Sequence, residues 1–431
     1  MKILVFNQDW FAKEWREMGH EVVTYGCRHD LEVQQSTFVI QVQHVLESLP
    51  ADFSPDVLVF HDNSMPVTVL GLEQVEIPTV FLSVDVHHHH EVHKYLSFIF
   101  DEVFVAQSDY IHLFEEIGSS ARWCPLWATR FIEPSADKQY GATFVGTLNA
   151  KLNPERVAFF DALSELIEVE LQCGKYWEIF PHAEIVLNQT VKGDLNFRVF
   201  EAMMSGSMLL TEKSGNGLFE LFQDGTHLAS YIKNDVDHAA ELIDYYLARP
   251  KLCREIGMAG RDEILRSHTS QVRAAELLDV ILGVTKKNHP ARYFASAYNL
   301  FLLSNRLESV HTPSVGQALV GSLKAASLGI DQGAELRPEL ASILVLAACK
   351  FDAMFKSNSG AQLIAELHEA YPEYEIFHLA RIRNCLNYGA LDEATQLVRQ
   401  VSDGDPKEMF QVAECAVTEL IDCYAEAVAL E

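Results

Sequence analysis

Short apolar runs alternate with amphipathic stretches along most of the chain. The first run covers residues 1–6 and is followed by a polar loop at 7–10 and a helical pattern from about residue 11. Apolar runs of about four to eight residues bounded by polar loops are typical of buried strands. The same pattern recurs at 21–25, 56–60, 79–83, 102–106, 184–187 and 208–211. This alternation predicts an α/β fold with parallel sheets.

The pattern changes near residue 288, where strand-like runs largely stop and amphipathic helices follow one another. We expect helices at 291–303, 317–326, 338–355, 361–371, 376–388, 391–401 and 409–430. Residues 388–394 (YGALDEA) resemble the helix junction of a tetratricopeptide-type repeat, although no repeated period is evident. The chain is therefore expected to hold Rossmann-like domains at 1–135 and 136–285, and a helical, TPR-like domain at 286–431.

The stretch 192–231 carries the clearest candidate chemistry. A polar loop leads to Asp194, which is placed as the N-cap of a helix, and Gly206 fits the stop of that helix. The helix is apolar on nearly every face except at Arg198 and Glu201, so we expect it to be buried.

A carboxylate inside such a helix is costly unless it is paired or hydrogen-bonded. Glu201 can accept hydrogen bonds from two vicinal hydroxyls, as binding a ribose diol requires. The free amides at the start of the helix, with Arg198, suit a diphosphate. The alternative is that Arg198 and Glu201, three residues apart, pair with each other.

Polar residues also follow the strands of the first domain, at 7–9, 61–63, 84–90 and 107–109. Ligands of parallel sheets bind at the carboxyl ends of strands, so these segments predict one site. Asp62 and Asn63 also fit a simple strand-end turn in which they cap the backbone.

Histidines occupy positions 87 to 90, and His93 follows closely. A zincin pattern fails because Lys94 stands where the second histidine is needed, and no third ligand has a typical spacing. We therefore expect no metal site. A histidine or aspartate near neutral pKa can instead act as a general base, so this segment is a candidate for proton transfer.

Acidic residues outnumber basic ones by 61 to 33, for a formal net charge of −28. This charge opposes binding to nucleic acid, which requires clusters of Lys and Arg. No apolar run reaches membrane-spanning length, so we expect no transmembrane segment. The 8 scattered cysteines and the absence of a signal-peptide pattern favour reduced, buried thiols and a cytoplasmic location.

The motifs DLNFRVFEAMMSG (194–206), GLFELFQDG (217–225) and FVGTLN (144–149) resemble the nucleotide-sugar half of GT-B glycosyltransferases, closest to the CgeB-like group. The resemblance implies that Glu201 binds the ribose and that Gly217 and Leu218 face the nucleotide. Gly146 ends the first strand of the second domain, where a glycine also permits close approach of the backbone to a ligand. Asp194, Asn196 and Arg198 complete the expected donor-binding set.

The segment 84–110 is similar to the Asp-x-His-x-His region of CgeB-like proteins, which maps onto Asp85, His87 and His89. If the reaction inverts the configuration of the anomeric carbon, a base is required in this region. If the reaction retains that configuration, these residues are expected to position the donor or the acceptor. Many relatives carry a second glutamate eight positions before Glu201. Gly193 stands at that position, which leaves the contact to the donor sugar undefined.

We expect a metal-independent glycosyltransferase that needs no cofactor and takes a UDP-, GDP- or dTDP-sugar as donor substrate. The acceptor is expected to be a glycan or protein hydroxyl. The helical domain either recruits that acceptor or serves as an appendage or homodimer interface. The alternatives are a nucleotide-sugar epimerase, a transferase with a metal on Asp235 and Asp237, and a non-catalytic scaffold with a decayed core.

Overall fold

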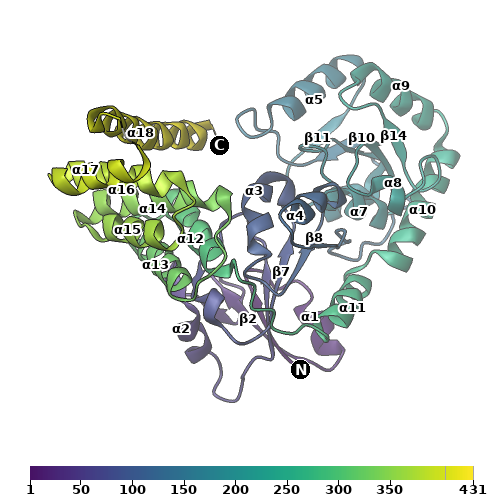
Figure 1. The fold of residues 1–431 in the computed structure, drawn as a ribbon. Coiled ribbons are helices and arrows are strands. Elements are labelled where there is room, and N and C mark those ends of the chain that lie inside the picture. Colours follow the sequence, from purple (N-terminus) through teal and green to yellow (C-terminus); the bar gives the residue numbers. More distant parts are fainter. Residues whose placement is uncertain (403, 431) are drawn as a thin grey trace.

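The computed structural model describes residues 1–402 and 404–430, which form two α/β domains followed by a helical tail (Figure 1). The N-terminal sheet has seven strands in the order β3-β2-β1-β5-β7-β8-β9, and every neighbouring pair is parallel. Its strands are β1 (Lys2–Phe6), β2 (Glu21–Gly26), β3 (Val33–Gln34), β5 (Val57–His61), β7 (Thr79–Ser83), β8 (Glu102–Val105) and β9 (Arg122–Trp123). A parallel pair beside it joins β4 (Ile40–Gln41) and β6 (Val69–Leu70).

The second sheet has five parallel strands in the order β11-β10-β12-β13-β14. They are β10 (Tyr140–Val145), β11 (Glu170–Gln172), β12 (Ala183–Asn188), β13 (Met208–Glu212) and β14 (Ala229–Tyr231). The central strands of both sheets are covered on their two faces, which is why they appear in the sequence as unbroken apolar runs. The predicted α/β class is confirmed.

Helices cover both sheets. The first domain has α1 (Ala12–Glu17), α2 (Val42–Glu47), α3 (Val86–Leu96) and α4 (His112–Glu116). The second has α5 (Pro154–Leu166), α6 (Tyr176–Ile179), α7 (Phe197–Met204), α8 (Leu218–Leu221), α9 (Val236–Leu247), α10 (Pro250–Ser267) and α11 (Ser270–Ile281). Helix α11 returns to the first domain, where Trp15 of α1 donates through Nε1 to the Ala274 carbonyl at 2.9 Å.

The tail consists of α12 (Arg292–Glu308), α13 (Thr312–Asp331), α14 (Pro338–Phe355), α15 (Ser359–Ala370), α16 (Glu375–Asn387), α17 (Leu391–Val401) and α18 (Pro406–Leu430). All seven helices predicted after residue 288 are present. The TPR-like character of the tail and the domain limits at 135 and 285 stay predictions. None of the described helices has the length and apolarity needed to span a bilayer.

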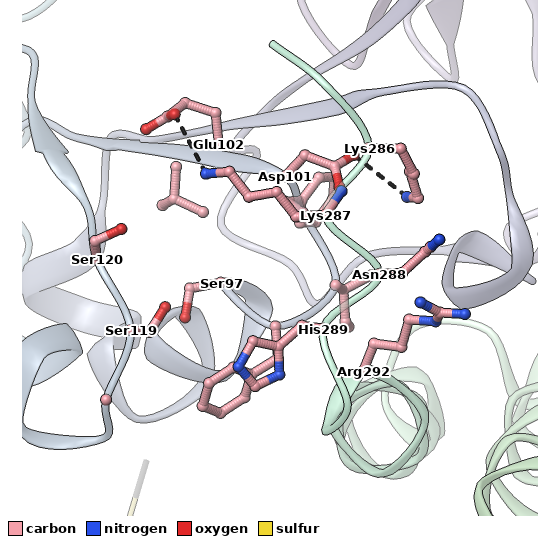
Figure 2. A pocket seen from close by; sticks show the side chains of 15 residues that line it. Ser97, Asp101, Glu102, Ser119, Ser120, Lys286, Lys287, Asn288, His289 and Arg292 are labelled. Atoms are coloured by element: carbon pink, nitrogen blue, oxygen red, sulfur yellow. Dashed lines mark hydrogen bonds and ion pairs between the residues drawn. The ribbon is translucent and has the colours of Figure 1, made fainter. Parts of the chain in front are cut away.

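The connector from α11 to α12 lies against the first domain (Figure 2). Asp101 accepts from the Lys287 backbone N–H at 2.7 Å and from Lys286 Nζ at 3.3 Å. Lys287 Nζ lies 3.6 Å from a Glu102 carboxylate oxygen. The same Asp101 carboxylate accepts from the Thr79 backbone N–H at 2.7 Å. One buried aspartate therefore fixes the connector to the start of β7.

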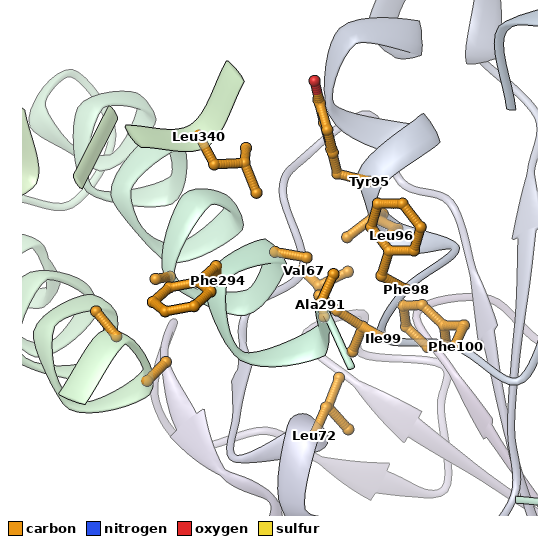
Figure 3. Close-up of a cluster of buried hydrophobic side chains, with 14 of the residues drawn as sticks. Val67, Leu72, Tyr95, Leu96, Phe98, Ile99, Phe100, Ala291, Phe294 and Leu340 are labelled. Atoms are coloured by element: carbon orange, nitrogen blue, oxygen red, sulfur yellow. The ribbon is translucent and has the colours of Figure 1, made fainter. Parts of the chain in front are cut away.

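The tail shares a hydrophobic core with the first domain (Figure 3). Phe294 and Leu340 of the tail belong to the same buried cluster as Leu72 and Leu96. Asn299 of α12 also forms two hydrogen bonds to the Val67 backbone, at 2.9 and 3.0 Å. The tail is thus joined to the first domain rather than to the second.

The cysteines differ in part from expectation. Cys124, Cys253 and Cys385 are buried, as predicted. The prediction of burial was wrong for Cys27, Cys173, Cys415 and Cys423, which are exposed because they lie in loops or on outer helix faces.

Candidate active site

A pocket of about 360 Å³ lies between the two α/β domains, at the carboxyl ends of both sheets. The first domain contributes Gln8, Trp10, Asp62, Asn63, Ser64, Val84, Asp85, His87 and Gln107. The second contributes Asp194, Asn196 and Phe197, and Leu126 comes from the segment between them. The structure thus brings Asp85 and His87 together with Asp194 and Asn196, although they are far apart in the sequence.

The N-terminal wall of the pocket is organised by Asp62. Its two carboxylate oxygens accept from the backbone N–H groups of Ser64 and Asp85, each at 2.8 Å. The Ser64 hydroxyl donates to the Asp85 carboxylate, which closes a ring of three residues. Burial, reinforced by the Asp85 charge, raises the pKa of Asp62 to about 6. The expected strand-end cap is present, and in addition it joins two separate loops.

The histidines differ in their positions. His87 is buried in the pocket wall, and burial lowers its pKa to about 4, so the ring is neutral at neutral pH. His89 is absent from the pocket lining and its ring packs against that of His93, with centroids 5.6 Å apart. A break in helical geometry at His89 (φ −126°, ψ 19°) turns it out of register with His87. The geometry therefore does not support His89 as a neighbour of His87 at the reacting centre.

The start of α7 also differs from expectation. Asn196, not Asp194, is the N-cap residue, and the helix begins at Phe197. Asp194 instead closes the preceding loop, because its carboxylate accepts from the Val191 N–H at 2.6 Å. Burial raises the pKa of Asp194. Both Asp194 and Asn196 line the pocket, so the error in the cap leaves them on the predicted surface.

Arg198 projects from the first turn of α7 towards the end of β10. Its Nε donates to the Val145 carbonyl at 3.0 Å and its Nη1 to the Asn188 side-chain oxygen at 2.7 Å. Its guanidinium lies over the Phe144 ring, 4.5 Å from the centroid. Burial, followed by the nearby charge of Arg156, lowers the pKa of Arg198 to about 10, which leaves it charged at neutral pH.

A second arginine lies beside the first. Arg156 is buried, donates to the Gln189 carbonyl at 2.9 Å, and is 5.7 Å from the Phe144 ring centroid. Among the described residues, no carboxylate oxygen lies within 4.0 Å of a guanidinium nitrogen of either arginine. Two neighbouring arginines thus lie at the carboxyl end of the second sheet, where the charges of Asp194, Glu201 and Glu212 act on them from beyond ion-pair distance.

Gly146 lies against the side chains of Arg198 and Phe144. A Cβ at this position would collide with the Arg198 guanidinium and would lie 2.7 Å from the Phe144 ring. Glycine is therefore required to make room for Arg198. The expected approach of a ligand to the Gly146 backbone stays a prediction.

Glu201 is partly buried and does not pair with Arg198. Its carboxylate accepts from the Thr129 hydroxyl at 3.0 Å and from the Tyr176 hydroxyl. Those two hydroxyls lie 2.9 Å from each other. Burial raises the pKa of Glu201, and the two hydrogen bonds oppose that shift. The carboxylate thus binds two adjacent hydroxyls, although both belong to the protein.

Gly217 and Leu218 lie at the domain interface and outside the pocket lining. Gly217 has φ 87°, and a Cβ there would collide with Trp123 of the first domain. Leu218 is fully buried. Nearby, the Asn216 side chain accepts from the Asp109 N–H at 3.2 Å and donates to the Gly193 carbonyl at 2.8 Å. This loop holds the domains together in the arrangement seen here, and Trp123 covers the face on which the nucleotide was expected.

Several pocket residues were not predicted. Trp10 follows the first strand in a loop held by two residues with positive φ, Asn7 (73°) and Phe11 (65°). Its ring packs near those of Trp127 and Phe197, with centroids 5.4 and 5.8 Å away. The presence of a tryptophan in a polar loop at a strand end could have indicated that Trp10 lines the site.

The described residues contain no group of three or more His, Cys, Asp or Glu side chains placed to hold a metal ion. Asp235 caps α9 by accepting from the His238 N–H at 2.9 Å, as expected for a cap. This use of Asp235 leaves the Asp-x-Asp string without support as a metal motif.

The comparisons agree with this architecture. Residues 130–279 match the protein family described as Glycosyl transferase-like. Among solved structures, a sucrose-phosphate synthase from Thermosynechococcus elongatus aligns with 66% of this chain and 98% of its own, at TM-score 0.50 and 11% identity. Anabaena HepE, solved with UDP and glucose, aligns with 66% of this chain and 100% of its own, at TM-score 0.51 and 12% identity.

No curated protein matches the chain by sequence. At such low identities the structural likeness establishes the fold, and the family match covers the second α/β domain. Together they show that the chain is a glycosyltransferase of the GT-B fold.

Proposed function

We propose that this enzyme transfers a sugar from a nucleotide sugar to an acceptor hydroxyl, without a metal ion, as a CgeB-like transferase. The observation that carries the proposal is the pair of arginines, Arg156 and Arg198, with no carboxylate at ion-pair distance among the described residues. Buried charges are normally paired. A diphosphate would supply an anion at ion-pair distance from both arginines at the carboxyl end of the second sheet.

Glu201 supports a nucleoside next to that diphosphate. Its carboxylate already accepts from two hydroxyls, which is the arrangement a ribose diol would present. In the donor complex, the ribose hydroxyls would replace those of Thr129 and Tyr176. Trp123 lies against Gly217, so a nucleotide that contacts Gly217 would require a small opening of the domain interface.

The chemistry would take place in the pocket between the domains. The acceptor oxygen attacks the anomeric carbon, and the bond from that carbon to the diphosphate oxygen breaks. Arg198 would stabilise the negative charge that develops on the leaving diphosphate. The acceptor proton would pass to the Asp85 carboxylate, and the neutral ring of His87 would accept a hydrogen bond from a sugar hydroxyl.

One structural neighbour suggests which donor to test first. HepE was solved with UDP and glucose, so UDP-glucose is the first donor to test. GDP- and dTDP-sugars follow. The acceptor is proposed to be a glycan or protein in the cytoplasm, recruited by the helical tail, whose TPR-like form would offer a concave surface.

Isothermal titration with UDP-glucose, GDP-mannose and a dTDP-hexose tests this function, followed by assays of nucleotide release with and without candidate acceptors. The proposal requires binding of at least one donor and slow release of its nucleoside diphosphate. A scaffold with a decayed core would bind none of them. An epimerase would convert the donor sugar with no acceptor present and release no diphosphate.

A further inference from the structure

The carboxylate of Asp62 connects the two loops that follow the paired strands β5 and β7. Asp62 directly follows β5, and its oxygens accept from Ser64 N–H and Asp85 N–H at 2.8 Å each. Asp85 is the N-cap residue of α3, and it lies 23 positions further along the chain. The pairing of β5 with β7 ends beside these loops, where the Asp62 N–H donates to the Leu82 carbonyl at 2.9 Å. Beyond that pairing, the Asp62 carboxylate fixes the backbones of Ser64 and Asp85 to each other.

The side chain of Asp85 depends on the same ring. Its carboxylate accepts from the Ser64 hydroxyl, and Ser64 is itself held with φ 59° in the left-handed region. A non-glycine residue keeps such a backbone only where its surroundings impose it. The Asp62 carboxylate, through the Ser64 N–H, is the local contact that does so.

We propose that Asp62 is a positioning residue for sugar transfer, which acts through Asp85 and His87 by fixing the start of α3 in the pocket wall. This inference rests on the proposed function. Since both Asp62 oxygens are occupied by backbone amides, its role is exerted through the loop and not by a contact to the reacting atoms.

Asp101 offers a matched control within the same domain. It is as buried as Asp62, with 4% of each residue exposed, and it also accepts from two backbone amides, those of Thr79 and Lys287, at 2.7 Å each. Asp101 lies at the other end of the sheet, where it fixes the connector. Replacing either aspartate by asparagine keeps the shape but sets an NH₂ group against a backbone N–H.

The experiment compares Asp62→Asn and Asp101→Asn in the full chain. UDP-glucose affinity is measured by titration, kcat by release of UDP, folding by denaturant unfolding, and mobility of residues 84–90 by hydrogen exchange. For Asp62→Asn we expect at least a 10-fold fall in kcat, donor affinity within 3-fold of wild type, and faster exchange at 84–90. For Asp101→Asn we expect a similar loss of stability with kcat within 3-fold of wild type. These thresholds are about the size of one lost hydrogen bond.

An unchanged kcat in folded Asp62→Asn would overturn the proposal, as would an equal fall in kcat for both variants. Weakened donor binding would also overturn it, since the Asp62 ring belongs to the first domain, whereas Arg198 and Glu201 belong to the second. Should Asp62→Asn not fold, Ser64→Ala serves instead, with an expected kcat about 3- to 10-fold lower; an unchanged kcat there overturns the proposal.

The proposed function can fail separately. If the wild type neither binds nor turns over any of the three donors, the transferase activity is refuted. Hydrogen exchange at 84–90 would then still show whether Asp62 fixes this loop, because that readout needs no substrate.

Discussion

Replacing Glu201 by alanine removes the carboxylate proposed to bind the ribose. In the structure it accepts from two hydroxyls, and in the complex it would accept from the 2′- and 3′-hydroxyls instead. Hydrogen bonds to a charged group contribute about 1.5–3 kcal/mol each, and releasing the Thr129 and Tyr176 hydroxyls offsets about 1 kcal/mol each. The net loss is about 1–4 kcal/mol, or about 5- to 1,000-fold in donor affinity.

The assay is titration of UDP and of 2′-deoxy-UDP into wild type and Glu201→Ala. Wild type should prefer UDP, by about 10-fold for one lost hydrogen bond to a charged group. In Glu201→Ala the two ligands should bind with the same affinity. If UDP is not the cognate nucleotide, the GDP pair replaces it.

A second pair of variants separates ribose binding from a structural role. Thr129→Val and Tyr176→Phe remove the protein hydroxyls that occupy Glu201, so together they should leave UDP affinity equal or higher. If Glu201 serves only to hold Thr129 and Tyr176, the double variant should lose as much stability as Glu201→Ala. UDP binding that survives Glu201→Ala with its preference over 2′-deoxy-UDP intact would refute the ribose assignment.

Three further predictions concern the phosphate region and the buried histidines. Arg198→Met should weaken UDP binding by about 10- to 100-fold and remove much of its salt dependence, as titration at two salt concentrations will show; unchanged affinity would contradict the role of Arg198. Gly146→Ala should displace Arg198 from the Phe144 ring, so UDP affinity should fall. The control is Gly141→Ala, whose Cβ would meet only Leu247, at 3.4 Å, and which should leave UDP affinity unchanged. Burial lowers the pKa of His61 and of His93 to about 3, so each stabilises the fold above pH 6.5 and loses that contribution as the pH falls towards 3. Denaturant unfolding at pH 7 and 5 should show lower stability at pH 5, by about 1.4 kcal/mol per histidine and pH unit; equal stability would contradict this origin.

The strands were predictable because each is a buried apolar run that ends in polar residues. The predicted strands 21–25, 79–83 and 208–211 differ from the observed ones by at most one residue at either end. The residues at these strand ends were also the ones that meet between the domains. Local pattern therefore located the pocket, since parallel sheets place ligand sites at one edge.

What the sequence could not supply were contacts between distant segments. Thr129 and Tyr176 lie 72 and 25 positions before Glu201, and nothing near them indicates that they bind its carboxylate. The contact of Trp123 with Gly217 depends on how the two domains are arranged, which the sequence pattern does not indicate. The N-cap of α7 was misplaced because Asp194 suits a cap by residue type, yet its carboxylate binds the loop at Val191.

The most direct test of the central claim is a crystal structure of this protein with UDP or GDP bound. The diphosphate should lie beside Arg198 and Arg156, the ribose hydroxyls should contact Glu201, and the site should open into the pocket formed by Asp85, His87 and Asn196. A nucleotide bound elsewhere, with Glu201 still held by Thr129 and Tyr176, would contradict the claim.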